Sequence, residues 1–262
     1  MMRYEGQVAL VTGAGRGLGR AAAEAFAREG AAVALVARRA EEIDEARSQI
    51  VSGGGKALAV RADVSDAASV SAAMRQVLDA FGRVDALVTC AAAEPAAGPS
   101  EELPLKDWQR VIDIDLTGAF LTCQAAGRVM LQQGYGRIVN LASFHVIATY
   151  PQRAAYAAAK TGVVGLTQAL AVEWAGRGVT VNVVAPGPIR TPRTSWFLSK
   201  DPGNEAGMIG RTPSGQLGET SDVAALILFL CSKEAGHING QNIVIDGGWT
   251  KNAWWGKHPW MG

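Results

Sequence analysis

Three polar side chains in the middle of the chain have types and a spacing that suit proton transfer at an oxygen atom. Tyr156 and Lys160 are four residues apart, so on a helix they share one face. A free phenol loses its proton near pH ~10, and a neighbouring ammonium lowers that pKa. Ser143 adds a hydroxyl that could hold a substrate oxygen beside the phenol. By themselves Tyr156 and Lys160 could be neighbours without a catalytic role, so the rest of the chain must decide between the two interpretations.

A glycine-rich turn lies between a strand pattern at residues 7–12 (QVALVT) and a helical pattern at residues 20–28. The turn holds Gly13, Gly15, Arg16, Gly17, Leu18 and Gly19. Glycines let a backbone approach a pyrophosphate, and a helix N-terminus offers free N–H groups and a positive dipole end. The spacing is GxxxGxG rather than GxGxxG, and the alternative is a flexible loop. The flanking strand and helix favour a dinucleotide site.

The end of the second predicted strand, residues 32–36, indicates which dinucleotide is bound. NAD-binding units usually carry an acidic residue there, which binds the ribose 2′-hydroxyl. This chain has Ala37 followed by Arg38 and Arg39, with Arg16 in the glycine turn. The planar donor fork of arginine suits a phosphate. We therefore expect NADP(H) to be favoured, with NAD(H) possible; the alternative is that these arginines are solvated surface charges.

Composition excludes several other classes of protein. The 262 residues are 48% apolar and 19% charged, with a formal net charge of +1, so no basic field for nucleic acid is expected. Three widely separated cysteines suggest neither a metal site nor a disulfide ladder, and favour a reducing compartment. No apolar run has membrane-spanning length, and the N-terminus leads almost directly into a strand. We expect a cytoplasmic protein without a membrane or nucleic-acid partner.

Strand and helix patterns alternate along the chain, which predicts a three-layer doubly wound parallel sheet, a Rossmann fold, in one domain over residues 1–262. Strands are expected at 7–12, 32–36, 57–60, 86–88, 137–142, 179–184 and 242–245, and helices at 20–28, 40–52, 65–81 with Ser65 as N-cap, 105–130 with a possible break at Gly118, 152–174 and 222–230. Ligands of such sheets bind beyond the carboxyl ends of the strands, where the glycine turn and Ser143 fall. Residues 191–218 form the longest irregular stretch, expected to be a lid or binding loop. The tail at 249–262 holds four tryptophans, which could pack on its own sheet, on a neighbouring subunit or over a substrate pocket.

With these residues laid out, the chain from about residue 5 to residue 248 resembles the short-chain dehydrogenase/reductase family. The matching motifs are Thr12, Gly13, Gly17 and Gly19 (TGxxxGxG), Asp63-Val64, Ser143 with Tyr156 and Lys160, Pro186-Gly187 through Ile189 to Thr191 (PGxxxT), and Asp246-Gly247-Gly248. The resemblance implies that Asp63-Val64 meets adenine and that Thr191 contacts the nicotinamide carboxamide. It also implies a homotetramer or homodimer, with the long helices pairing between subunits.

Two positions depart from the family pattern. The family usually has NNAG after the fourth strand, where this chain has Thr89, Cys90, Ala91 and Ala92; their backbone could still line the adenosine side. The family also has an asparagine in the long helix, where this chain has Asp115. Asp115 could accept the same hydrogen bond and pair with Lys160, with a shifted pH profile as the expected result.

The resemblance implies an NADP(H)-dependent oxidoreductase that interconverts a secondary alcohol and a ketone, with no metal ion. Tyr156 would act as general acid or base, Lys160 would favour the phenolate and hold the nicotinamide ribose, Ser143 would bind the substrate oxygen, and Asp115 would support the proton relay. Enoyl reductases of the family usually separate the tyrosine and lysine more widely. The alternative from another class is a nucleotide-binding regulator or scaffold that has lost catalysis.

The sequence does not identify the substrate. Residues on segments expected to face the pocket are His145, Tyr150, Gln152, Trp196 and Phe197. Each could equally be an ordinary loop residue or a packing anchor. A mixed aromatic and polar lining would admit a cyclic alcohol, a sugar or a small keto compound.

Overall fold

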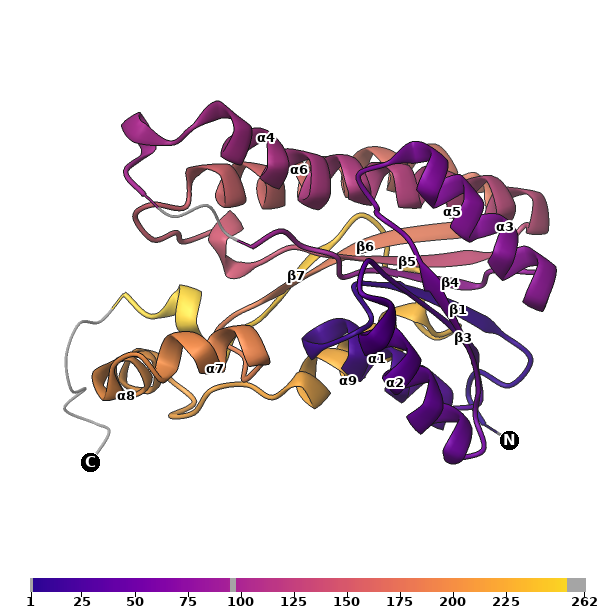
Figure 1. The fold of residues 1–262 in the computed structure, drawn as a ribbon, viewed down its shortest axis with the longest axis horizontal. Coiled ribbons are helices and arrows are strands. Elements are labelled where there is room, and N and C mark those ends of the chain that lie inside the picture. The colour runs from indigo at the N-terminus through magenta and orange to yellow at the C-terminus, as the bar shows by residue number, and fades with distance from the viewer. Residues whose placement is uncertain (1, 95–97, 254–262) are drawn as a thin grey trace.

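Seven parallel strands form one sheet at the centre of the protein. The computed structural model describes residues 2–94 and 98–253 (Figure 1). The strands are β1 (Val8–Thr12), β2 (Ala32–Ala37), β3 (Lys56–Arg61), β4 (Ala86–Thr89), β5 (Gly136–Leu141), β6 (Val179–Pro186) and β7 (Asn242–Ile245). Their spatial order is β3-β2-β1-β4-β5-β6-β7, and every pairing is parallel. The order reverses between β1 and β4, so the chain leaves these two adjacent strands toward opposite sides and opens a crevice at their carboxyl ends.

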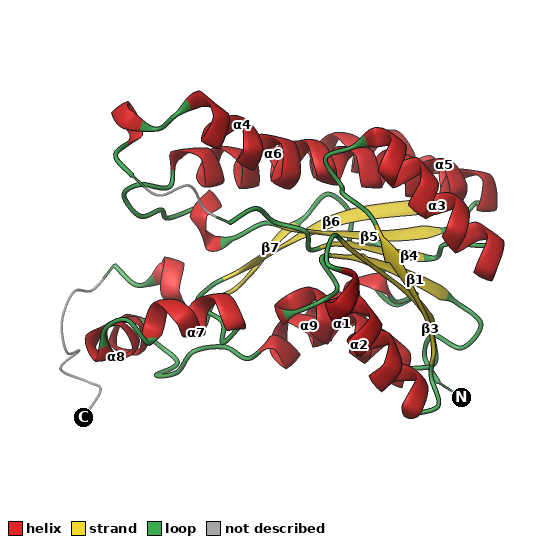
Figure 2. Cartoon of the chain, in the orientation of Figure 1, coloured by secondary structure: helices red, strands yellow, loops and turns green. Residues whose placement is uncertain are grey.

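Helices cover both faces of the sheet, which confirms the predicted three-layer Rossmann architecture (Figures 1 and 2). One face carries α1 (Gly17–Arg28), α2 (Ala40–Ser52) and α9 (Thr220–Cys231), and the other carries α3 (Ala67–Phe81), α4 (Leu105–Ile112), α5 (Gly118–Gln133) and α6 (Ala154–Trp174). The short helices α7 (Pro192–Leu198) and α8 (Pro202–Arg211) lie together beyond the sheet in the same view.

Apolar side chains from the strands fill a core on each side of the sheet. The strands β1, β5 and β6 are buried along their whole length. The β1 strand therefore reads as a continuous apolar run, whereas β5 and β6 also bury polar residues such as Asn140 and Asn182. One core packs β1 and β2 against α1, α2 and α9, with Phe26 and Ile227 fully buried. The other packs the strands against α3, α5 and α6 around Met130 and Trp174. Gly127 lets Trp174 approach α5, since a Cβ there would lie 2.6 Å from the indole.

Two predicted element boundaries on the N-terminal side of the site were wrong. The helix α1 begins at Gly17, inside the glycine turn, rather than at residue 20. The N-cap of α3 is Asp66, whose carboxylate accepts the N–H of Ala68 at 2.9 Å, rather than Ser65. Ser65 instead donates its N–H and its hydroxyl to Asp63. An acidic side chain caps a helix as well as serine does, so the pattern alone did not decide between neighbours.

The long helix expected at 105–130 is interrupted before Gly118. A π-helical turn at Asp113–Thr117 separates α4 from α5. Its wider hydrogen-bonding pattern inserts an extra residue into the helix and so changes which side chains face inward. The helix expected from residue 152 begins at Ala154, because Gln152 has a left-handed backbone with φ of 61°.

The stretch at 191–218 is not irregular throughout, because it contains α7 and α8. Each begins with a proline in its first turn, and the caps are the side chains of Thr191 and Asp201. Proline fits the first turn of a helix, where its missing N–H is not needed. In the tail, Trp249 is 3% exposed and packs on its own chain, whereas Trp254, Trp255 and Trp260 lie outside the described residues. Within the part of the chain that is described, none of the helices combines the length and apolar character needed to span a bilayer.

Candidate active site

A cleft of about 540 Å³ opens beyond the carboxyl ends of β1 and β4. Among the residues predicted to bind a cofactor, those that line it are Gly13, Gly15, Arg16, Gly17, Leu18, Gly19, Arg38, Arg39, Val64, Cys90, Ala91, Ala92, Tyr156, Lys160 and Thr191. Asp63, Pro186, Gly187 and Ile189 are not part of its lining. Lining residues that the sequence analysis missed are Glu42, Ala62, Glu94, Ile114, Leu141, Ala142, Pro192 and Arg193.

Two glycines allow the backbone segments of the cleft to come close together. Gly13 has a left-handed φ of 64°, and a Cβ there would lie 2.7 Å from the backbone of Cys90 and Ala91. A Cβ on Gly19 would lie 2.3 Å from the carbonyl oxygen of Gly13. Because α1 begins at Gly17, its first N–H groups face this turn without intrahelical partners. The turn therefore suits a pyrophosphate, which needs close backbone approach and N–H donors.

The far end of the cleft holds two arginines that are each paired with a carboxylate. The Nε atom of Arg39 lies 2.6 Å from Glu42 Oε1, and Arg38 Nη1 lies 3.9 Å from Asp63 Oδ2. Burial opposes ionisation of Asp63, but hydrogen bonds from Ser65 and the charge of Arg38 outweigh it and lower its pKa. Both arginines are more than half exposed, so these pairs are weak and an incoming phosphate can replace the carboxylates.

Lys160 and Asp115 form a buried ion pair behind Tyr156. The Nζ atom of Lys160 donates to the Leu141 carbonyl at 3.0 Å and lies 3.4 Å from Asp115 Oδ2. The same ammonium lies 5.7 Å from the centre of the Tyr156 ring. Burial disfavours the charged lysine, but the charges of Asp115 and Tyr156 outweigh this effect and raise its pKa. Lys160 therefore stays protonated although only 3% of it is exposed.

The π-helical turn at Asp113–Thr117 carries Asp115, which is 2% exposed. Its other carboxylate oxygen accepts the N–H of Ala93 at 2.6 Å. Asp115 therefore joins the loop after β4 to the lysine of α6. The tyrosine, lysine and aspartate predicted from the sequence are brought together, and the position of Asp115 agrees with the expected pairing to Lys160.

Ser143 lies just beyond β5 and is connected to Tyr156 through His145. The Ser143 hydroxyl caps the short 3₁₀ turn Phe144–Val146 by accepting the N–H of His145 at 3.4 Å. The His145 ring stands edge-to-face on the Tyr156 ring, with centres 5.4 Å apart. Ser143 is 7% exposed and does not line the cleft that holds the glycine turn.

An aromatic cluster continues from His145 to the end of the chain. Tyr150 contacts His145 at 5.0 Å between ring centres and Trp249 at 6.5 Å. The guanidinium of Arg211, the last residue of α8, lies 4.7 Å from the Trp249 ring centre. Of the other predicted substrate residues, Gln152 and Phe197 are exposed. Trp196 lies in α7, and its side chain is outside the described part of the structure.

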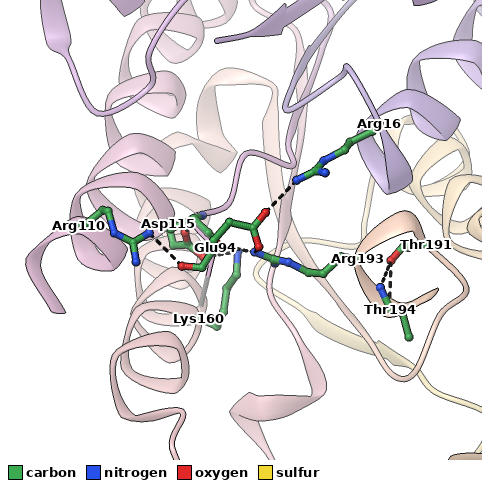
Figure 3. A network of polar contacts seen from close by, with 9 residues as sticks. Arg16, Glu94, Arg110, Asp115, Lys160, Thr191, Arg193 and Thr194 are labelled. Carbon is green, nitrogen blue, oxygen red and sulfur yellow. Dashed lines mark hydrogen bonds and ion pairs between the residues drawn. The ribbon is translucent and has the colours of Figure 1, made fainter. Parts of the chain in front are cut away.

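A network of charged side chains connects residues that line the cleft (Figure 3). The carboxylate of Glu94 lies 2.8 Å from Arg16 Nη2 and 3.5 Å from Arg193 Nη2. Arg193 also donates to the Ala93 carbonyl, and Arg110 donates to the Glu94 carbonyl at 3.0 Å. The glycine turn, the loop after β4, α4 and α7 thus meet at one residue. Sequence reasoning missed Glu94 and Arg193, because nothing in a loop and a distant short helix signals that they pair.

Known proteins match this chain over nearly its whole length. The sequence model of a family described as enoyl-(acyl carrier protein) reductase matches residues 13–250. D-threitol dehydrogenase from Mycolicibacterium smegmatis is 43% identical over 250 residues, which are 95% of this chain and 94% of that protein. Two solved structures also match. A crystal structure of levodione reductase has a TM-score of 0.91 and 36% identity, covering 96% of this chain and 100% of its own. A candidate NAD(P)-dependent gluconate 5-dehydrogenase from Beutenbergia cavernae, with bound NADP, has a TM-score of 0.90 and 40% identity, covering 96% and 99%.

These matches run over nearly the whole chain and include named dehydrogenases and reductases. The TM-scores of the two solved structures show that they share the fold described above. The chain therefore belongs to the short-chain dehydrogenase/reductase family, whose members are NAD(P)-binding oxidoreductases acting on CH–OH and C=O groups.

Proposed function

We propose that this protein interconverts a secondary alcohol and a ketone with NADP(H), using Ser143, Tyr156 and Lys160. The observation that carries the proposal is the cleft in which the glycine turn and the Tyr156–Lys160 face meet, with Asp115 buried behind the lysine. The cleft fits a dinucleotide, because the glycines let the turn pack closely on the loop after β4 and α1 begins at the cleft with free N–H groups. Relatives named as a threitol dehydrogenase and a levodione reductase fit an alcohol or ketone substrate.

Each polar side chain has a distinct role in this proposal. Tyr156 gives a proton to the substrate oxygen during reduction and takes it back during oxidation. Lys160, kept charged by Asp115, favours the ionised phenol and donates to the nicotinamide ribose. Ser143 hydrogen-bonds the substrate oxygen, and Asp115 positions Lys160. The bound nicotinamide would supply or accept the hydride.

The cofactor preference rests on the arginines at the end of the cleft. Arg38 and Arg39, with Arg16, would bind the 2′-phosphate of NADP(H), because guanidinium groups match phosphate geometry. Asp63, Val64, Cys90, Ala91 and Ala92 would border the adenosine. Thr191, with the loop of Pro186, Gly187 and Ile189, would border the nicotinamide. We also propose that the chain folds as one domain, works in the cytoplasm and forms a homodimer or homotetramer.

A panel of ketones and aldehydes with NADPH and NADH tests the activity and the cofactor together. We expect turnover with NADPH preferred. Arg38→Ser should weaken NADPH use about tenfold, since it removes a charged partner of the phosphate. Arg47→Ser, which also removes an exposed arginine beside a carboxylate, is the matched control and should change little. A thirtyfold preference for NADH, roughly 2 kcal/mol, would contradict the arginine argument.

The role of Tyr156 is tested by Tyr156→Phe. General acid–base catalysis contributes about a hundredfold or more, so turnover should fall by at least that factor while NADPH affinity is retained. Retained turnover would refute the assignment. If the unaltered protein binds NADPH but turns over no substrate of the panel, the alternative of a nucleotide-binding regulator gains support.

A further inference from the structure

The ring of His145 is held on three sides by other aromatic rings. Phe144 packs on it at 4.3 Å between ring centres, Tyr150 stands edge-to-face at 5.0 Å, and Tyr156 does so at 5.4 Å. Its backbone N–H donates to the Ser143 hydroxyl. His145 therefore contacts both residues whose hydroxyl groups are assigned to the reacting oxygen.

A hydrogen-bond chain determines which nitrogen of this ring carries the proton. His145 Nδ1 lies 3.0 Å from the Thr149 hydroxyl oxygen, and that hydroxyl donates to the Tyr150 carbonyl at 3.4 Å. A hydroxyl has one proton to donate, so Thr149 accepts from an Nδ1–H group. In a neutral imidazole the other nitrogen, Nε2, is then a hydrogen-bond acceptor. None of the described residues hydrogen-bonds Nε2.

The surroundings of the ring keep it neutral near pH 7. Burial disfavours the charged form, and the nearby Arg153 repels it, so the pKa of His145 is lowered to about 4. A protonated ring would carry N–H donors on both nitrogens. The neutral ring has a free lone pair on Nε2, whereas its Nδ1–H group donates to Thr149.

We propose that His145 Nε2 accepts a hydrogen bond from a hydroxyl on the carbon next to the reacting carbon, so the preferred substrates are vicinal diols and α-hydroxyketones. The inference rests on the proposed function, in which Ser143 and Tyr156 hold the reacting oxygen. An acceptor beside those two hydroxyls selects O–H over a second C=O, because two acceptors cannot hydrogen-bond each other. The neighbouring hydroxyl takes no part in bond making or breaking, so the reaction itself is unchanged.

The test compares 2,3-butanediol with 2-butanol, which differ by one hydroxyl group. We expect the unaltered protein to prefer the diol in kcat/KM. His145→Phe keeps an aromatic ring in the cluster and removes the acceptor, so it should lower the diol-to-alcohol ratio about tenfold, the effect of losing one hydrogen bond of ~1.4 kcal/mol. His237→Phe, the same change at an exposed histidine, is the matched control and should leave the ratio unaltered.

Nitrogen-15 NMR of the histidine rings gives a readout that does not depend on turnover. At pH 7 the His145 signals should be those of a neutral ring protonated on Nδ1. Thr149→Val removes the partner of that proton, so it should mix the two tautomers and also reduce the diol preference.

Several outcomes would overturn the inference. A ring protonated on Nε2, no diol preference in the unaltered protein, or an equal loss for both alcohols in His145→Phe each contradicts it. If 2-butanol is oxidised but His145→Phe leaves the diol-to-alcohol ratio of kcat/KM unaltered, the inference fails and the proposed function stands. If neither alcohol is oxidised with NADP⁺ or NAD⁺, and no ketone is reduced, both fail.

Discussion

At the scale of single residues, the pairing of Asp115 with Lys160 sets the charge behind the phenol. Because the pair is buried, the carboxylate offsets the field that the ammonium exerts on Tyr156. An asparagine at this position could still accept the N–H of Ala93 but would carry no charge. We therefore expect the acidic side chain to tune the proton transfer without being needed to hold the loop.

Asp115→Asn tests this tuning. Without the carboxylate, the ammonium acts on the phenol unopposed, so the acid limb of the alcohol-oxidation rate should move to lower pH. The measurement is the pH–rate profile. Asp113→Asn makes the same change in the same π-helical turn, at a carboxylate bonded to Gln109, and should leave the profile in place. An unaltered profile in Asp115→Asn would count against a role in proton transfer.

At the scale of elements, the π-helical turn is kept in place by close packing next to it. The first residue of α5, Gly118, faces Val64 in the turn that borders the cleft. A Cβ on Gly118 would lie 2.7 Å from a Val64 methyl group and 3.3 Å from its carbonyl carbon. A larger residue would therefore push α5 away from the cleft wall.

Gly118→Ala should lower the free energy of unfolding by about 1–3 kcal/mol, because the overpacking outweighs the better helix propensity of alanine. It should also weaken NADPH binding through Val64. Gly165→Ala, in the middle of α6, is the control: a Cβ there meets nothing within 4 Å, so stability should stay equal or rise by up to ~1 kcal/mol. Urea unfolding and NADPH titration measure both effects. Equal stability of the two variants would contradict the packing argument.

The sequence predicted well those elements whose burial or backbone conformation leaves a local pattern of residue types. Strands buried on both faces show as apolar runs, and Gly13 shows as a turn residue because its backbone is left-handed. The elements it predicted poorly depend on context. Residues 191–218 were expected to be irregular, but Pro192 and Pro202 in this stretch begin helices, and the π-helical turn has no periodic signal of its own.

In the candidate site too, contacts within one helix were predicted from the sequence and contacts between distant segments were not. Tyr156 and Lys160 are neighbours through helix geometry, so their spacing alone predicts that they share a face. The contact of Glu94 with Arg193 joins residues nearly a hundred positions apart. Its formation depends on how α7 folds back over the cleft, which no local pattern encodes.

At the scale of the whole molecule, several large apolar side chains remain exposed on the helices of one layer. Leu105 in α4, Phe120 in α5 and Val172 in α6 are 76%, 40% and 83% exposed, and these helices cover the same face of the sheet (Figure 1). Exposed apolar residues on three helices of the same layer suit an interface between copies of the chain. This supports the proposed homodimer or homotetramer, with α5 and α6 at the contact.

Phe120→Glu and Val172→Glu test that interface. Each places a charge where the proposed contact would exclude water, so light scattering after gel filtration should show a smaller assembly than for the unaltered protein. Val51→Glu, on the opposite layer in α2, replaces a similarly exposed apolar residue and should leave the mass unaltered. A monomer mass for the unaltered protein at micromolar concentration would refute the proposal.

The Glu94 side chain, set between Arg16 and Arg193, acts as an internal substitute for an anionic ligand. A simple anion such as inorganic phosphate gains little by displacing it, because it exchanges one ion pair for another of similar strength. A dinucleotide also binds the backbone donors of the glycine turn and the arginines at the far end of the cleft. These additional contacts would make its binding favourable even though the Glu94 carboxylate is displaced from its arginine partners. We therefore expect the cleft to discriminate against small anions while accepting the full cofactor.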